Sequence, residues 1–322
     1  MNNVRWSLWP LARFMVRKGL RAAGLLALVA TAVFFAGRGL PGDPVTAVLG
    51  PGLRDPATVA ALRKAYDLDA PLPAQYKNFL LRLAHGQFGF SLETGVPVGA
   101  ELAERAPVTL TLAGSAFLVA CFFGLPVGAW LAFVGGRRAD APVTVALAAA
   151  QAVPVYILGI GFLYVFSYRL NWFPVLGGQD DIRSWILPVI TLSLSLGVYL
   201  ARLTRQSILA LLPRINLLAL HAFGVPGPRI WARHILPNAA PAVVTAMAIV
   251  LAYALAGNIL LEATFSLRGV GQLLARAVLN RDYPLLQGVC VWIAAGFLLL
   301  NLAAEIVAGV ADPRLREDHA RR

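Results

Sequence analysis

Side chains that could catalyse a reaction or bind a metal are few in this sequence, and they lie far apart. The chain has only three lysines and no G-x-x-x-x-G-K-[ST] sequence, so it has no phosphate-binding loop with which to hold ATP. Its four histidines lack the spacing of a metal site, and the motifs of Ser/His/Asp hydrolases are absent. The lysines are Lys18, Lys64 and Lys77, and the histidines are His85, His221, His234 and His319. We therefore expect no catalytic, cofactor-binding or metal site on this chain.

Two polar residues near the carboxyl-terminal end of an apolar segment could still have a function. Asn301 and Glu305 are four residues apart, which places them on the same face of a helix. A carboxylate inside a membrane can relay protons, so Glu305 could serve an ion-coupled secondary transporter. Such transporters concentrate several ionisable groups near the bilayer midplane, whereas here Glu305 stands alone at the end of its segment. We therefore favour a structural role for Glu305 and keep the transporter as the alternative.

The composition of the chain shows which elements must position these residues. Hydrophobic residues make up 58% of the 322 residues, charged residues only 14%, and the mean hydropathy is +0.69. Soluble proteins carry about 25% charged residues, and a water-facing protein of this length cannot bury so much apolar surface. A membrane-spanning helix needs about 20 apolar residues. Six segments reach or approach that length: 22–37, 106–136, 141–168, 184–201, 235–261 and 283–304. The sequence predicts an all-α integral membrane protein with six transmembrane helices.

Almost the whole net charge of +12 falls on one side of these six segments. If the amino terminus is cytoplasmic, sixteen basic and four acidic residues lie in cytoplasmic segments, and the outer segments are nearly neutral. This distribution follows the positive-inside rule, so we expect both termini to be cytoplasmic and no nucleic acid as a partner. An Ala-x-Ala sequence at Ala30 and Ala32 resembles a signal cleavage site, but it lies inside the first apolar run. We favour an uncleaved anchor.

These segments divide the chain into five parts. We expect a basic cytoplasmic tail at 1–21, a first transmembrane helix at 22–40, an extracytoplasmic insertion at 41–104, a five-helix core at 105–311 and a cytoplasmic tail at 312–322. The insertion has mixed polarity and predicts helices at 58–66 and 75–84. The long cytoplasmic segment 202–236 carries five arginines, two histidines and no acidic residue. It is the expected docking surface for a partner protein.

Short sequences in a distinctive order resemble a known family. Each is weak alone, and the resemblance that they carry together covers residues 17–316. They are PGDP at 41–44, YDLDAPLPAQY at 66–76, GQFGFSL at 86–92, RAPVTL at 105–110, LNWFPVLG at 170–177, RLTR at 202–205, RH at 233–234, NRDYP at 280–284 and DPRLR at 312–316. In this order they resemble the first permease subunit of the dipeptide, oligopeptide and nickel importers of the ABC superfamily.

The resemblance implies a fold, a function and a set of partners. The fold is the transmembrane domain of a type I ABC importer, in the bacterial cytoplasmic (inner) membrane. The chain would be a non-catalytic permease subunit for peptides or similar small solutes. Its partners would be a second homologous permease subunit in a heterodimer, two cytoplasmic ABC ATPase subunits that bind ATP and Mg, and an extracytoplasmic solute-binding protein. The surrounding membrane lipid completes the assembly.

The resemblance also implies that segment 202–236 couples the permease to its ATPase. Permeases of this family insert a short cytoplasmic helix, with a Glu-Ala-Ala-like pattern followed by a glycine, into a groove on the ATPase. Gly224 fits the glycine, which can also end the helix, but Leu218 stands where the acidic residue would be. Prolines at 226 and 228 should break the helix early. The candidate coupling residues are Ala219, His221, Gly224, Arg229, Arg233, His234, Leu236 and Pro237.

The arginines of this segment allow two interpretations. Arg202, Arg205, Arg229 and Arg233 could anchor the segment at the cytoplasmic face, as the positive-inside rule requires, or contact the ATPase directly. The sequence does not separate these roles.

Overall fold

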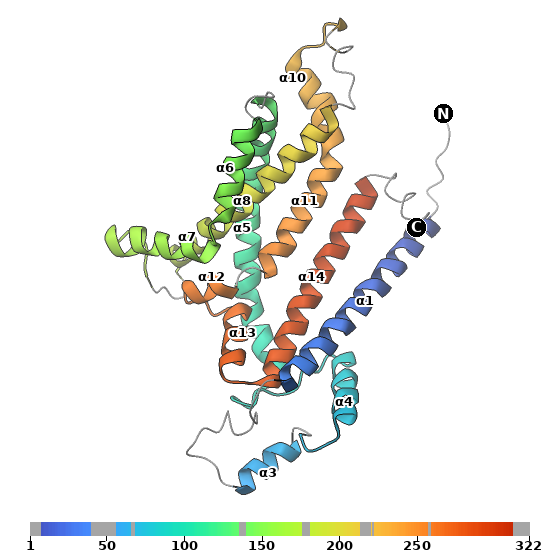
Figure 1. The fold of residues 1–322 in the computed structure, drawn as a ribbon, viewed down its shortest axis with the longest axis vertical. Helices are drawn as coiled ribbons and strands as arrows, with labels where there is room; N and C mark the ends of the chain where they lie inside the picture. The colour runs from blue at the N-terminus through green and yellow to red at the C-terminus, as the bar shows by residue number, and fades with distance from the viewer. Residues whose placement is uncertain are drawn as a thin grey trace. The chain divides into compact units, whose positions relative to one another are not determined.

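The structure, a computed structural model, describes residues 8–39, 56–65, 68–134, 140–175, 181–212, 220, 222–256 and 259–311. Within these ranges the elements are helices, and one isolated bridge pairs Phe90 with Pro97, so the prediction of an all-α protein is confirmed. Figure 1 labels the α-helices, and the helices of the described ranges, with two π-helical turns among them, follow in chain order. They are α1 (Leu8–Gly39), α3 (Pro56–Ala65), α4 (Leu72–Ala84), α5 (Val98–Val134), α6 (Asp140–Ala152), α7 (Val155–Phe162), η1 (Leu163–Arg169), α8 (Arg183–Leu211), α10 (Gly227–Ile230), η3 (Trp231–Ile235), α11 (Leu236–Ala256), α12 (Ile259–Thr264), α13 (Val270–Leu279) and α14 (Tyr283–Ala311).

Five stretches of helix are long and apolar enough to cross a membrane, and a bent pair of helices makes a sixth candidate. They overlap the six segments predicted from the sequence, although most extend beyond the predicted ends. The two helices predicted in the insertion are also present, as α3 and α4. The five stretches are Met15–Arg38, Val98–Val134, Arg183–Leu211, Gly227–Leu255 and Tyr283–Ala303.

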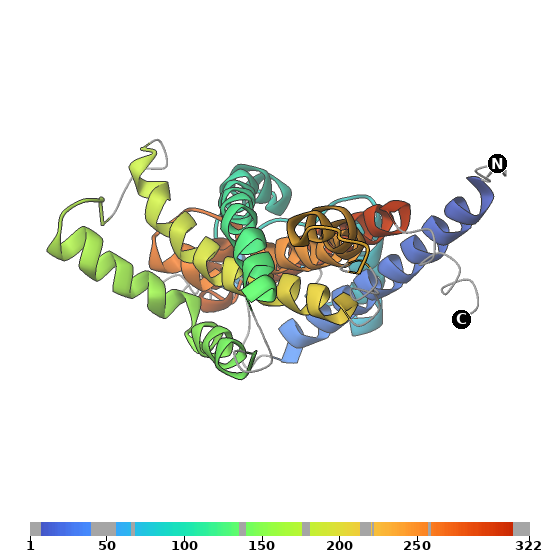
Figure 2. The same ribbon diagram turned by 90° about the horizontal axis from the view of Figure 1, so that it is seen from above.

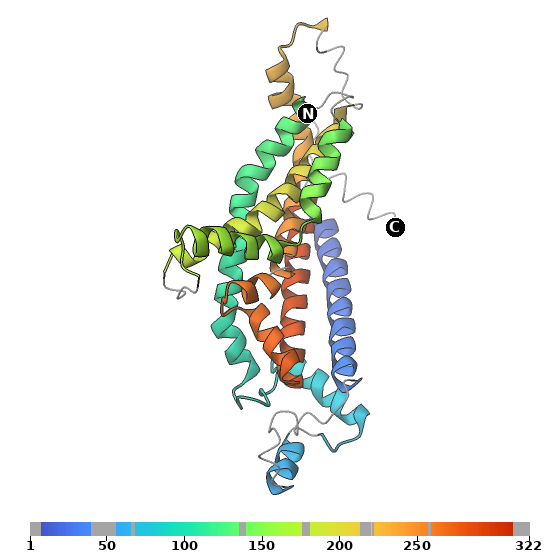
Figure 3. The ribbon, with the colours of Figure 1, turned by 60° about the vertical axis from the view of Figure 1, so that its left-hand side comes forward.

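The third predicted segment, 141–168, is not one continuous helix. It is bent by 74° between α6 and the rod formed by α7 and η1. Pro154 stands at the break, where it lacks an N–H group to donate and disfavours a helical conformation of Val153 before it. Figure 2 shows α7 and η1 as one continuous rod, and Figure 3 shows the bend between that rod and α6.

The chain forms two compact units. The first comprises Met1–Ala22, Thr111–Gly257 and Phe297–Arg322, and here α8 packs against α6, α7 and α11. Within this unit α5 and α8 approach closely at glycines. A Cβ atom on Gly128 would lie 2.5 Å from the carbonyl oxygen of Ala201, and one on Gly124 would lie 2.7 Å from that of Gly197. The lack of a side chain at Gly124 and Gly128 therefore allows the two backbones to approach.

The second unit comprises Ala23–Leu110 and Asn258–Gly296. Its core joins the first turns of α5, the buried face of α13 and the first turns of α14. Each fully buried aliphatic side chain contributes about 1.5–3 kcal/mol through the apolar surface that it removes from water. The core residues are Val98, Leu102, Val270, Leu273, Ala277, Leu285 and Val289.

A buried carboxylate at Glu262 ties α12 to α5 and α13 within the second unit. Glu262 is completely buried, and its Oε1 accepts a hydrogen bond from the hydroxyl of Thr109 at 2.7 Å. Its Oε2 accepts from the backbone N–H groups of Gly271 and Gln272 at 2.8 and 3.2 Å. These are among the first N–H groups of α13, which have no partner inside the helix. The negative charge also lies at the positive end of the helix dipole.

A second buried carboxylate, Asp282, joins the insertion to the start of α14. Its Oδ2 accepts from the hydroxyl of Ser91 at 2.5 Å and from the N–H of Glu93 at 3.2 Å, and its Oδ1 accepts from the N–H of Leu285 at 3.1 Å. Two of the short sequences that carried the family resemblance, at 86–92 and 280–284, therefore meet through this side chain. Asp282 caps α14 and fixes where the insertion returns to the helices.

Candidate functional site

The candidate coupling segment contains a helical turn that ends at Gly224. Residues 220 and 222 are helical, and Gly224 has a φ of +72°, which a glycine adopts without strain. The N–H of Val225 donates to the carbonyl oxygen of Leu220 at 3.1 Å. This hydrogen bond and the positive φ define a Schellman motif, in which the glycine stops the helix and the next residue closes the cap. Gly224 thus ends a helix, as its sequence context suggested.

One face of this turn is held by an apolar cluster within the first unit. Leu220 and Val225 pack against buried side chains from the ends of three spans, α5, α8 and the helix that begins at Gly227. The buried members are Ala132, Ile208, Ile230, Ile235 and Ala239. Because the capped turn is packed on these spans, a force applied to the turn reaches them directly.

The other face of the turn carries an aromatic ring in the open. Phe223 is 84% exposed, although it directly precedes the capping glycine. An exposed aromatic side chain on a capped turn is a typical anchor for a pocket on a protein partner. Phe223 is not among the residues predicted from the sequence, although an aromatic residue beside the glycine of an acid-free segment was a signal for it.

Prolines and glycine restart the helix immediately after this turn. Pro226 caps α10 and Pro228 lies in its first turn, where a proline needs no hydrogen-bond partner. From Gly227 the chain remains helical to Leu255 through the π-helical turn η3, so segment 202–236 is helical at both ends. Along this restarted helix Arg229, Arg233, Leu236 and Pro237 are exposed and His234 is half-buried. Ala219 and His221 lie outside the described residues.

Two arginines of the segment bind the chain itself. Arg202 donates to the side-chain oxygen of Gln151 at 2.7 Å, and Arg205 donates to the hydroxyl of Thr144 at 3.1 Å. Only 4% of Arg205 is exposed. Both partners lie on α6, so this pair anchors α8 to α6, whereas Arg229 and Arg233 are exposed.

The polar pair near the end of the chain lies on one helix. Asn301 and Glu305 both belong to α14, and Asn301 is half-buried. Their spacing therefore places them on the same side of that helix, as expected. Among the described residues, no group of three His, Cys, Asp or Glu side chains is placed to hold a metal ion.

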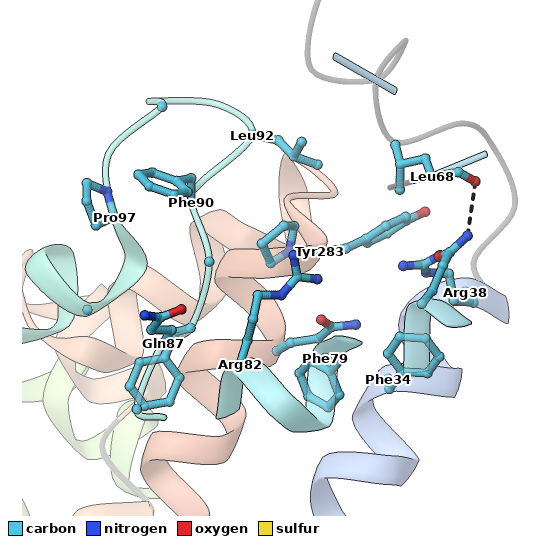
Figure 4. A pocket seen from close by; sticks show the side chains of 18 residues that line it. Phe34, Arg38, Leu68, Phe79, Arg82, Gln87, Phe90, Leu92, Pro97 and Tyr283 are labelled. Atoms are coloured by element: carbon cyan, nitrogen blue, oxygen red, sulfur yellow. Dashed lines mark hydrogen bonds between the residues drawn. The ribbon is translucent and has the colours of Figure 1, made fainter. Parts of the chain in front are cut away.

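A second candidate site, absent from the predictions made from the sequence, is a cavity of about 800 Å³ within the second unit (Figure 4). Its lining comes from the end of α1, from α4, from residues 86–99 and from the start of α14. Residues of three sequences quoted above, at 66–76, 86–92 and 280–284, contribute to it. No local pattern indicated it, because the contributing segments are far apart in the chain.

Comparisons with known proteins cover nearly the whole chain. The family model "Binding-protein-dependent transport system inner membrane component" matches residues 124–317, and the model of its N-terminal part matches residues 11–113. The chain is 31% identical over 310 residues to the "Probable peptide ABC transporter permease protein y4tP" of Sinorhizobium fredii, covering 94% of this chain and 99% of that protein. It is also 31% identical over 303 residues to the "Glutathione transport system permease protein GsiC" of Salmonella typhi, covering 94% and 98%.

A solved structure resembles the fold. An inward-facing form of the MetNI methionine ABC transporter matches with a TM-score of 0.56 at 17% identity, covering 66% of this chain and 96% of the matched one. At that identity the likeness concerns the fold, which is the transmembrane domain of a type I importer.

Proposed function

Because this chain belongs to the family of binding-protein-dependent transport system inner membrane components, we propose that its cargo is a short peptide and that residues 220–225 couple it to an ATPase. Proteins of this family are permease subunits of ABC importers in the inner membrane. The chain is therefore a multi-pass, non-enzymatic subunit, and ATP is hydrolysed on separate subunits. The peptide cargo is supported by the 31% identity to a peptide permease over 94% of the chain.

Family membership implies a second permease, ATPases and a binding protein as partners. Within this set we propose a heterodimer of homologous permeases, two ATPases that hold all the ATP and Mg, and one extracytoplasmic solute-binding protein. The charge distribution supports cytoplasmic termini, with the tails 1–21 and 312–322 inside and the insertion 41–104 outside. In this orientation segment 202–236 of the five-helix core, 105–311, faces the ATPases.

The exposed ring of Phe223 is the observation that supports the coupling role. A turn seated in a groove of the ATPase moves with that ATPase, because the docked side chain has no freedom of its own. Leu220 and Val225 transmit the movement to the apolar cluster, and hence to α8 and α11. Closure of the ATPases around ATP would then shift the population of permease conformations, provided that the groove binds one conformation more tightly.

The coupling proposal is tested by replacing Phe223 with aspartate in the complete complex. We expect the Phe223→Asp complex to lose roughly tenfold or more of its peptide-stimulated ATP hydrolysis, as for a central anchor of an interface. Leu279→Asp is the matched control, because Leu279 is 81% exposed but belongs to the second unit and not to the coupling segment. Equal ATPase activity and equal ATPase retention in both variants would refute the coupling assignment.

The cargo is tested separately, by mass spectrometry of the ligand that co-purifies with the solute-binding protein. A peptide supports the proposal, and a different class of solute overturns it without affecting the coupling assignment. The ion-coupled alternative built on Glu305 has no support from the relatives or the fold. Transport that requires ATP and persists in Glu305→Gln would exclude it.

A further inference from the structure

The cavity in the second unit contains polar groups that lack partners. Within the described part of the chain, three buried atoms in its lining make no hydrogen bond: Nε of Arg38, the hydroxyl of Tyr283 and Nε2 of Gln287. Tyr283 and Gln287 are only 4% and 7% exposed, so bulk water does not reach these groups freely. Burying unpaired donors is costly, and all three belong to residues that line this one cavity, so a bound acceptor that reached them would remove that cost.

The charge of the cavity lining indicates which kind of acceptor fits there. Two arginines, Arg38 and Arg82, line the cavity, and no carboxylate does so among the described residues. Arg38 is held in position by a hydrogen bond to Oε1 of Gln75, and Gln75 in turn donates to the carbonyl oxygens of Leu68 and Ala70 at 3.0 and 2.7 Å. Donors that are fixed in advance and carry positive charge favour an anion with several oxygen atoms, such as a phosphate.

The rest of the lining is aromatic. The rings of Phe34 and Phe79 pack with their centroids 5.4 Å apart, and Phe34 also lies 5.0 Å beneath the guanidinium of Arg38. Figure 4 shows these rings beside Arg38, with Arg82 and Tyr283 in the same lining. A small inorganic anion would leave this apolar surface unused. The ligand therefore combines an anionic head with an apolar body.

The position of the cavity relative to the membrane identifies such a ligand. Arg38 is the last residue of one membrane-spanning stretch and Tyr283 the first residue of another. Arginine and tyrosine at span ends lie at the level of the lipid headgroups. On the membrane side of this level, α1 exposes apolar side chains, among them Leu25, Leu28 and Phe35. An acyl chain could lie along them.

We propose that this cavity is a binding site for an anionic phospholipid. Its phosphate accepts hydrogen bonds from Arg38, Tyr283 and Gln287, the charge of Arg82 favours an anionic over a zwitterionic headgroup, and an acyl chain lies along the exposed face of α1. The bound lipid would fasten the insertion to the end of α1. This site goes beyond the transport function and does not depend on which solute is carried.

The test is native mass spectrometry of the purified, delipidated permease complex with phosphatidylglycerol or phosphatidylethanolamine added back. The wild-type complex should bind phosphatidylglycerol more tightly. The double variant Tyr283→Phe with Gln287→Leu should bind it roughly tenfold or more weakly, since two hydrogen bonds to a charged acceptor are removed. Arg38→Gln should show a similar loss. Lys77→Gln is the control, because Lys77 is an exposed cation on α4 that does not line the cavity.

Three results would overturn the proposal. They are equal binding of the two lipids by the wild type, unchanged phosphatidylglycerol binding in both cavity variants, and competition of a dipeptide for the site, which would make it a carboxylate site for cargo. Thermal unfolding of each variant in detergent without lipid separates a lost site from a lost fold. A variant that melts as the wild type does, yet binds less phosphatidylglycerol, supports the lipid site.

Discussion

The two compact units hold their helices together with different kinds of contact. In the second unit, buried carboxylates at Glu262 and Asp282 accept hydrogen bonds from segments that are far apart in the sequence. In the first unit, α5 and α8 meet at Gly124 and Gly128, and an apolar cluster packs the span ends against Leu220 and Val225 of the candidate coupling segment. Its tertiary hydrogen bonds include those of Arg202 and Arg205 to α6, where an arginine rather than a carboxylate is the shared group.

The hydrogen bonds to buried carboxylates in the second unit fix the positions of its helices relative to one another. The packing at small residues in the first unit allows small displacements. A buried carboxylate that accepts three hydrogen bonds must lose them to shift by even one ångström, because their strength falls steeply with distance and angle. Close packing at small residues has no such direction, and packed helices can slide by small amounts. The candidate coupling segment thus belongs to the unit whose helices meet at small residues, and we expect that unit to adjust more readily than the unit with the buried carboxylates.

Removing the carboxylate of Glu262 should have the largest effect, and it tests whether the second unit depends on its buried carboxylates. Glu262→Ala leaves the Thr109 hydroxyl and two backbone N–H groups buried without an acceptor, which we expect to cost about 3 kcal/mol or more. Thermal unfolding of the purified protein measures the loss. Glu104→Ala is the control, because Glu104 is an exposed carboxylate on α5. If both variants melted alike, the second unit would not depend on its buried carboxylate.

Adding one methyl group between α5 and α8 tests whether the first unit depends on the close approach of these two helices. A Cβ atom on Gly128 would meet backbone atoms of Ala201, so Gly128→Ala must push the helices apart, at a cost of about 1–3 kcal/mol. Gly114, also on α5, has open space around its Cα, so Gly114→Ala should be neutral or stabilise by up to about 1 kcal/mol. The measurement is thermal unfolding together with peptide uptake. Equal effects of the two substitutions would show that the close approach is unimportant.

The smallest expected effect is the contribution of Glu93, a surface carboxylate of the second unit, to the stability of the fold. Partial burial raises the pKa of Glu93, but hydrogen bonds from Arg276 and Asn280 and the charge of Arg276 outweigh it and hold the pKa below its usual value. A lowered carboxylate pKa stabilises the fold above the unfolded pKa, near 4.3, and this stabilisation is lost as the pH falls through the folded pKa. Because the pair is about a third exposed, we expect less than about 1 kcal/mol.

The measurement for Glu93 is the difference in melting temperature between the wild type and Glu93→Gln from pH 7 to pH 3. The advantage of the wild type should disappear at the acidic end, and Glu104→Gln should show no such trend. An advantage that stayed constant with pH would mean that packing, not charge, makes the contribution of Glu93.

Much of the fold could be predicted because the membrane imposes a local requirement. Each span must satisfy its own backbone hydrogen bonds and present apolar side chains, so its position is written in consecutive residues. The cap at Gly224 was predictable for a similar reason, since a Schellman motif involves only six neighbouring residues. The 74° bend at Pro154 shows the limit of this reasoning. A proline interrupts a helix, but the angle at which the next helix continues depends on what that helix packs against.

By itself, then, the sequence determined the class of protein, its spans and the sidedness that their charges favour. Only the tertiary structure decided which polar groups are paired. Ser91 and Asp282 are 191 positions apart and Thr109 and Glu262 are 153 apart, and hydrogen bonds between such distant residues leave no periodic pattern in the chain. The exposure of Phe223 and the three unpaired atoms of the cavity are likewise features that leave no pattern in the sequence. Whether a side chain is buried, paired or left open depends on the neighbours that folding brings to it.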